Sequence, residues 1–251
     1  MKLVTLASVT LLTLFSSKDN SKNSPVNDGN QENGFAVVEL FTSEGCSSCP
    51  PADEALAEIN KEYDKNVFAL SFHVDYWDYL GWKDEFSDPA YSQRQQGYGS
   101  AFKLESIYTP QVIVNGRKEF VGSDKSLLDK TIKEELKSIE NNPIKINVVD
   151  SGDKTINIQY EATANDKMML NIALVQLRTS SDVKRGENKG RKLNHVNVVR
   201  GFKRIPLTAT GSGSVQFAIP PAFTKDGYKV VAYLQDKNSL RITGAAERSF
   251  N

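Results

Sequence analysis

The chain contains two cysteines, Cys46 and Cys49, and two serines separate them. Two thiols at this spacing can form and break a disulfide with each other, which permits thiol–disulfide exchange with a partner. Two other uses of the pair stay open. A disulfide that closes so short a loop can act as a structural staple, although it removes only about 2 kcal/mol of chain entropy. Two thiolates assisted by His73 or a methionine can instead bind Cu(I).

In thiol–disulfide exchange the two cysteines have different roles. We expect Cys46 to lie nearest the solvent, at the mouth of the turn, and to attack the sulfur of a partner. Cys49 lies one turn deeper and resolves the mixed disulfide. Pro50 and Pro51 follow directly. Either Cys49 caps a helix that begins at Pro50, which moves Cys46 away from the positive helix end, or the prolines distort the first turn.

The segments around the pair predict how it is held. Residues 35–41 are mostly apolar and form a candidate buried strand, and residues 50–63 have the apolar spacing of a helix. Residues 67–74 form a second buried strand, which we expect to be parallel to the first because a helix intervenes. His73 ends this strand, and we interpret it as a core or rim residue.

Residues 75–108 are rich in aromatic side chains and too long for a structureless loop. We expect one or two inserted helices, the second starting at Asp88-Pro89. Trp77 and Trp82 either pack over the domain or line a groove for a client peptide.

A hairpin and a helix are predicted next. Asn115-Gly116 between two apolar runs is typical of a two-residue hairpin turn. Ser123 or Asp124 can then cap a helix that extends to about Glu140.

From Ile144 to the end, short alternating runs recur about every ten residues. Six to eight strands over these ~107 residues favour a β-sandwich. Residues 143–251 are therefore predicted to form a second, all-β domain.

The first residues predict export. Residues 1–17 have a basic start and an apolar run too short to span a bilayer, as in a signal peptide. Ser17 stands where a bacterial lipoprotein has its lipidated cysteine, so this chain cannot form a thioether anchor there. Residues 18–34 are polar and predict a flexible tether that can hold the folded part near a membrane. We expect a periplasmic, envelope-associated or secreted protein without a membrane span.

The bulk composition excludes some classes of function. Lys plus Arg and Asp plus Glu both number 31, so the charge gives no reason to expect a nucleic-acid partner. The two histidines, His73 and His195, lie in different halves of the chain, which makes a zinc site unfavourable. We predict no metal and no cofactor.

Several motifs together resemble one family. They are the cysteine segment 41–53, the segment 73–82, Thr109-Pro110-Gln111, and the segments 186–191 and 195–200. As a set they resemble a secreted bacterial thioredoxin-like family of unknown function. The resemblance implies an α/β thioredoxin-like domain with a helical insertion (residues 35–142), followed by the all-β sandwich domain. It also implies that Pro110 is a cis proline facing the dithiol, with Thr109 beside it.

The resemblance leaves four charged or titratable residues of the second half without a role. We interpret Glu187, Arg191, His195 and Arg200 as a charged loop and a strand edge that hold the sandwich together.

The sequence thus predicts an exported thiol–disulfide oxidoreductase with Cys46, Cys49, Thr109 and Pro110 at its site. Its partners would be protein thiols or disulfides and a redox partner. The alternatives are a binding or assembly module of the cell envelope with a structural or vestigial disulfide, and a Cu(I)-binding chaperone.

Overall fold

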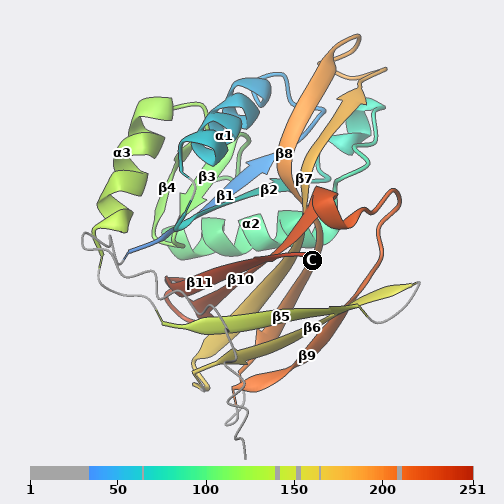
Figure 1. Ribbon diagram of the computed structural model, residues 1–251. Helices are drawn as coiled ribbons and strands as arrows, with labels where there is room; N and C mark the ends of the chain where they lie inside the picture. The colour runs from blue at the N-terminus through green and yellow to red at the C-terminus, as the bar shows by residue number, and fades with distance from the viewer. Residues whose placement is uncertain are drawn as a thin grey trace, which may run out of the picture. The chain divides into compact units, whose positions relative to one another are not determined.

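Two β-sheets dominate the computed structural model, which describes residues 34–63, 65–138, 142–150, 154–163, 165–207 and 211–250. One sheet has eight strands in the order β11-β10-β7-β8-β2-β1-β3-β4, and the other has three in the order β5-β6-β9 (Figure 1). The helices among these residues are α1 (Pro50–Glu62), α2 (Pro89–Phe102) and α3 (Lys125–Leu136). The strands are β1 (Ala36–Thr42), β2 (Val67–His73), β3 (Gln111–Val114), β4 (Lys118–Val121), β5 (Ile144–Asp150), β6 (Thr155–Ala162), β7 (Met168–Asp182), β8 (Lys192–Pro206), β9 (Ser212–Ala218), β10 (Tyr228–Asp236) and β11 (Ile242–Ser249).

The predicted elements of the first half are confirmed. β1 and β2 are parallel and joined by α1, and every residue of β1 is buried. The two paired strands end at Thr42 and His73, which lie opposite each other. The chain continues from Thr42 into the cysteine turn and from His73 into the aromatic stretch. The predicted signal and tether, residues 1–34, fall outside the described residues except for Gly34.

Apolar side chains cover both faces of the eight-stranded sheet. One face of β1 packs against α1 and α3, with Leu40, Leu56 and Ile132 in a common core. The other face packs against Tyr91 and Tyr98 of α2, and this core continues onto β7, β8 and β10. The three-stranded sheet packs through a separate apolar cluster onto β7 and β10.

The predicted fold class is wrong. The protein is mostly β, and strands from both sides of position 142 belong to one sheet, so it is not a thioredoxin-like α/β domain followed by a sandwich. The two halves of the chain are joined in this sheet by the parallel pairing of β2 with β8, at Ser71 and Val198. Backbone groups on the outer edge of β2 require hydrogen-bond partners when buried, and β8 supplies them. Alternating patterns identify strands but do not specify such a long-range partner.

The aromatic stretch after β2 forms helices as predicted. A short 3-10 helix covers Asp78–Leu80, and α2 follows. Asp88 caps α2 by accepting a hydrogen bond from the backbone of Ala90 at 2.8 Å. α3 begins after Asp124, whose side chain accepts from Leu127 at 2.9 Å, and it ends at Leu136, earlier than predicted.

The β3–β4 hairpin is present, with three residues rather than two between the paired Val114 and Lys118. Asn115 and Gly116 have φ values of 49° and 64°. A Cβ on Gly116 would collide with the carbonyl oxygen of Leu240.

We expect Gly116→Ala to lower the free energy of unfolding by about 2 kcal/mol, because it adds both backbone strain and this collision. Urea unfolding measures the loss. The matched control is Gly97→Ala, since a Cβ at Gly97 in α2 meets nothing within 4 Å, and it should not destabilise the protein. Equal effects of the two substitutions would contradict the assignment.

Candidate functional site

Cys46 and Cys49 form a disulfide with a Cα–Cα distance of 5.4 Å. Cys49 occupies the N-cap position of α1 and Pro50 its first helical position. The backbone amide of Cys49 donates to the carbonyl oxygen of Cys46 at 3.3 Å, so the two cysteines bound a turn that precedes the helix. Of the two alternatives left by the sequence, the capping one is correct. Cys46 therefore lies one turn away from the positive helix end.

The disulfide is buried, which corrects the expectation that Cys46 faces the solvent. Cys46 and Cys49 are both 0% exposed, whereas Ser47 and Ser48 between them are exposed. The exposed serines leave the turn itself at the surface. The sulfurs are covered by segments from elsewhere in the chain, which the sequence pattern does not bring together.

The Thr109–Pro110 segment lies beside the disulfide. The peptide bond between them is cis, as expected. The Sγ atom of Cys46 is 3.9 Å from the carbonyl oxygen of Thr109. All four site residues predicted from the sequence, Cys46, Cys49, Thr109 and Pro110, thus come together.

An insert, defined as residues 75–88, contacts both the cysteine turn and Thr109. The indole nitrogen of Trp77 donates to Oγ1 of Thr109 at 2.8 Å. A Cβ on Gly45 would lie 2.9 Å from Cβ of Trp77, so this glycine permits the close approach. The indole nitrogen of Trp82 donates to Oε2 of Glu44 at 2.7 Å. Both tryptophans are half-buried and contact the site through these hydrogen bonds.

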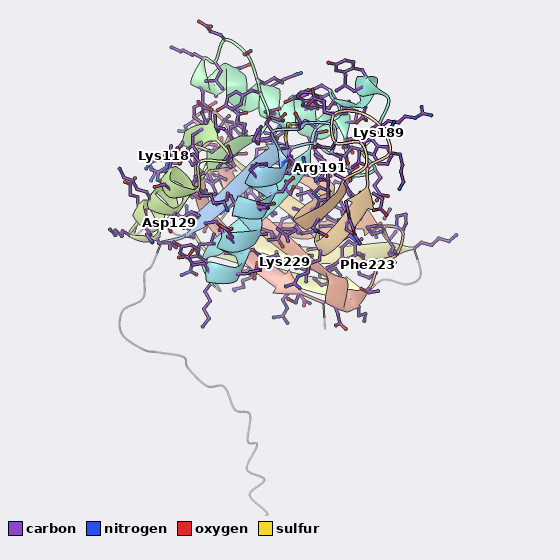
Figure 2. The ribbon with its side chains drawn as sticks, turned by 90° about the horizontal axis from the view of Figure 1, so that it is seen from above. Lys118, Asp129, Lys189, Arg191, Phe223 and Lys229 are labelled. Carbon is purple, nitrogen blue, oxygen red and sulfur yellow. A yellow bond between two sulfur atoms is a disulfide. The ribbon has the colours of Figure 1, made fainter. Side chains whose placement is uncertain are left out.

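A strap, defined as residues 183–191 at the tip of the β7–β8 hairpin, bonds to the backbone of the turn and lies beside the insert, since a Cβ on Gly186 would be 3.6 Å from Cβ of Trp82. The backbone amide of Ser47 donates to Oε2 of Glu187 at 2.9 Å. The side-chain amide of Asn188 donates to the carbonyl oxygens of Glu44 at 2.9 Å and Cys46 at 2.8 Å. Lys189 and Arg191 mark the strap in Figure 2, and Arg191 donates to Oδ1 of Asn188 at 2.8 Å.

A cluster of buried acids and histidines lies next to the cysteine turn. Nδ1 of His73 is 2.7 Å from Oδ2 of Asp84, which also accepts from the backbone amide of Glu44 at 2.9 Å. The ring of His195, from β8, lies 4.8 Å from that of His73. Nε2 of His195 is 3.4 Å from Oε1 of Glu44, and its Nδ1 is 3.8 Å from Oδ2 of Asp53.

The polar groups of this cluster are incompletely paired. Both ring nitrogens of His195, Nε2 of His73 and Oε1 of Glu44 are buried without a hydrogen-bond partner among the described residues. Such atoms are uncommon in protein interiors and concentrate at functional sites. The described residues contain no group of three or more His, Cys, Asp or Glu side chains placed to hold a metal ion.

The cluster contains carboxyl groups with opposite pKa shifts. Burial raises the pKa of Asp53 from 3.8 to about 7, although the nearby His195 acts in the opposite direction. Burial also acts to raise the pKa of Asp84, but the adjacent His73 and hydrogen-bond donors hold it below its ordinary value. A carboxyl that titrates near neutral pH can accept or donate a proton under physiological conditions.

Sequence reasoning missed the cluster and the strap. His195 is 2% exposed and lies on β8, which pairs on both sides, so its interpretation as part of a strand edge is wrong. Arg200 of the same strand packs over the ring of Phe86, with its guanidinium carbon 4.7 Å from the ring centroid. The inward position of His195, between buried Leu193 and Asn197, comes from the burial pattern of β8, and the polar Asn197 on the same face hides it in the sequence.

Comparisons with known proteins place these features in a family. No curated protein matches the chain. A structural-genomics protein of Agrobacterium tumefaciens matches with a TM-score of 0.66 and 29% identity, over 86% of this chain and 94% of that chain. A domain of the outer membrane lipoprotein Omp28 from Porphyromonas gingivalis matches with a TM-score of 0.29 and 15% identity, over 45% of this chain and 91% of that domain.

A family model described as "Protein of unknown function (DUF1223)" matches residues 37–235. The match includes the cysteine turn, the insert, the strap and both histidines. No helix in the described ranges has the length and apolar character needed to cross a bilayer. The chain belongs to the DUF1223 family.

Proposed function

We propose that this protein is an exported thiol–disulfide oxidoreductase that acts on protein thiols or disulfides in the cell envelope. The observation that carries the proposal is the position of the pair: a Cys46–Cys49 disulfide at the start of α1, with Sγ of Cys46 3.9 Å from the carbonyl oxygen of Thr109. A redox-active pair needs two thiols that can bond to each other and a neighbouring backbone group against which a client can align.

In the reducing direction, the protein dithiol reduces a client disulfide in two steps. The Cys46 thiolate attacks one sulfur of a client disulfide, so a Cys46–client bond forms and the other client sulfur leaves as a thiolate. The Cys49 thiolate then attacks Sγ of Cys46, which closes the Cys46–Cys49 disulfide and releases the second client thiolate. The client gains two electrons and the protein loses two. A dithiol redox partner restores the reduced pair, and the reverse sequence oxidises a client dithiol.

The buried carboxyl of Asp53 supports this chemistry. Asp53 follows Cys49 by one helical turn, and its pKa of about 7 permits proton exchange at neutral pH. Reduction of a disulfide to two thiols takes up two protons, which a buried site cannot take directly from bulk water. We propose Asp53 as a residue of the neighbouring cluster, 3.8 Å from Nδ1 of His195, that can hold a proton during the reaction.

The test is a trapping experiment with the full chain and insulin as the probe. Cys49→Ser should accumulate a mixed disulfide between Cys46 and insulin, visible by mass spectrometry and lost on reduction. Wild type should accelerate insulin reduction by dithiothreitol, and Cys46→Ser should abolish that acceleration. Cys46→Ser with wild-type activity, or no mixed disulfide with Cys49→Ser in any strap variant described below, would refute the proposal.

A second candidate is an envelope binding or assembly module in which the disulfide is structural. The observation that favours it is the complete burial of both sulfurs. In that case reduction should destabilise the protein without transferring electrons to insulin. The same insulin assay therefore separates the two candidates.

A further inference from the structure

The proposed function requires a client to reach a disulfide that is 0% exposed. A protein sulfur cannot attack Cys46 or Cys49 while both residues are fully buried. A segment beside the cysteine turn must therefore move before any exchange. The Thr109–Pro110 segment leads directly into the buried strand β3, which leaves the insert and the strap as candidates. The contacts that each segment makes with the cysteine turn distinguish between them.

The insert is held by buried groups. Oδ2 of Asp84 contacts Nδ1 of His73 at 2.7 Å and accepts from the Glu44 amide at 2.9 Å, while Oδ1 accepts from the Phe86 amide at 2.9 Å. Asp84 is 1% exposed. Displacement of the insert would leave this carboxylate and its partners unpaired, which is costly in a protein interior.

Val183 and Asn188 of the strap are 0% exposed, and three hydrogen bonds hold the strap on the cysteine turn. They are the Ser47–Glu187 hydrogen bond, which is exposed, and the two bonds from Asn188 to backbone carbonyls. The strap keeps its own shape through backbone bonds between Val183 and Gly190 at 2.8 Å and between Val183 and Arg191 at 2.9 Å. Opening at the end of the hairpin would break the three bonds to the cysteine turn and expose Asn188, while these two backbone bonds keep the strap itself folded.

We propose that the strap is an autoinhibitory segment that occupies the client-binding position of the cysteine turn. This inference rests on the proposed function and names the regulation of the same site. In the closed state the strap is hydrogen-bonded to the Ser47 amide and to the carbonyl oxygens of Glu44 and Cys46. In the open state these groups become one donor and two acceptors beside the disulfide. They are the groups to which an extended polypeptide client would hydrogen-bond.

The experiment measures how fast the buried disulfide is reduced by tris(2-carboxyethyl)phosphine in the folded full chain. Each event oxidises one phosphine to its oxide, with oxygen from water, and yields two thiols, which alkylation and mass spectrometry count. Asn188→Ala removes two hydrogen bonds and should accelerate reduction about 30-fold. Glu187→Gln weakens one exposed bond and should accelerate it about threefold. The control Glu161→Gln on β6, whose exposed partner is Lys145, should leave the rate unchanged.

Rates within twofold of wild type for both strap variants would overturn the proposal. So would acceleration by Asn188→Ala with the steep urea dependence of global unfolding, since strap opening exposes little surface and should depend weakly on urea. Glu187→Gln alters an exposed contact, so it tests the proposal even if Asn188→Ala fails to fold.

The outcome is distinguishable from failure of the proposed function. If the strap variants are reduced faster by phosphine but neither they nor wild type reduce insulin, the strap covers a disulfide that is not catalytic. If wild type reduces insulin and the strap variants are no faster with phosphine or insulin, the function stands and the autoinhibitory strap does not.

Discussion

Replacing Glu39 with alanine is expected to lower the free energy of unfolding by about 3–5 kcal/mol. Glu39 lies in β1, is 0% exposed and is the carboxylate partner of Arg94 from α2. Nε of Arg94 donates to Oε2 of Glu39, and Nη2 of Arg94 donates to Oε1, both at 2.7 Å. Without Glu39 the guanidinium would remain buried among aromatic rings with no opposing charge.

The rings around Arg94 make the loss larger than for a surface pair. Its guanidinium carbon lies 5.1 Å from the ring centroid of Tyr98 and 4.9 Å from that of Phe202. These faces attract the cation, but they do not replace a bidentate carboxylate. Because Arg94 joins α2 to β1 while packing on β8, the loss should weaken the contact between the two halves of the chain.

Urea unfolding of Glu39→Ala measures this effect, with Glu161→Ala as the matched control. Glu161 pairs with Lys145 through side chains that are 63% and 78% exposed, and such pairs contribute about 0–1 kcal/mol. A double variant, Glu39→Met with Arg94→Met, should recover at least half of the loss because it removes both buried charges. A loss below about 1 kcal/mol for Glu39→Ala would contradict this account.

Much of the local structure could be predicted because local patterns determine it. The apolar run of β1, the Asp88-Pro89 start of α2 and the Asn115-Gly116 turn each depend on neighbouring residues. The sheet order could not be predicted in this way. The pairing of β2 with β8 joins residues more than a hundred positions apart, and nothing in either strand specifies the other.

The site was predictable to the same extent. The spacing of Cys46 and Cys49 indicates the disulfide, and family resemblance indicates Thr109 and Pro110. The contact of the strap with the cysteine turn forms in a sheet in which β8 is paired with β2, far away in the sequence. The meeting of the two histidines has the same cause, since β2 carries His73 and β8 carries His195.

The acid–histidine cluster predicts an inverted pH dependence of stability. Asp53 titrates near pH 3.8 in an unfolded chain and at about 7 in the native protein, chiefly because burial disfavours its charged form. Between these values the native state retains a proton that the unfolded state has released. The contribution of Asp53 to the free energy of unfolding should therefore fall as pH rises from about 4 to about 7, by roughly 4 kcal/mol.

Asp53→Asn should remove this fall. The amide cannot ionise, so the variant should match wild type near pH 4 and exceed its free energy of unfolding at pH 8 by up to roughly 4 kcal/mol. Glu44 and Asp84 act to raise the pKa of Asp53, whereas His195 acts to lower it. In a His195→Gln background, the gain from Asp53→Asn at pH 8 should therefore be larger than in the wild-type protein.

The control is Asp129→Asn on α3, because the pKa of Asp129 is shifted in the opposite direction to that of Asp53. Hydrogen bonds from Lys133 and Tyr63 lower the pKa of Asp129, so its contribution is present above the unfolded pKa and lost as pH falls through the native one. Asp129→Asn should thus give no gain at pH 8. If Asp53→Asn also gives no gain there, Asp53 is already ionised at low pH in the native protein, and it cannot hold a proton for the disulfide at neutral pH.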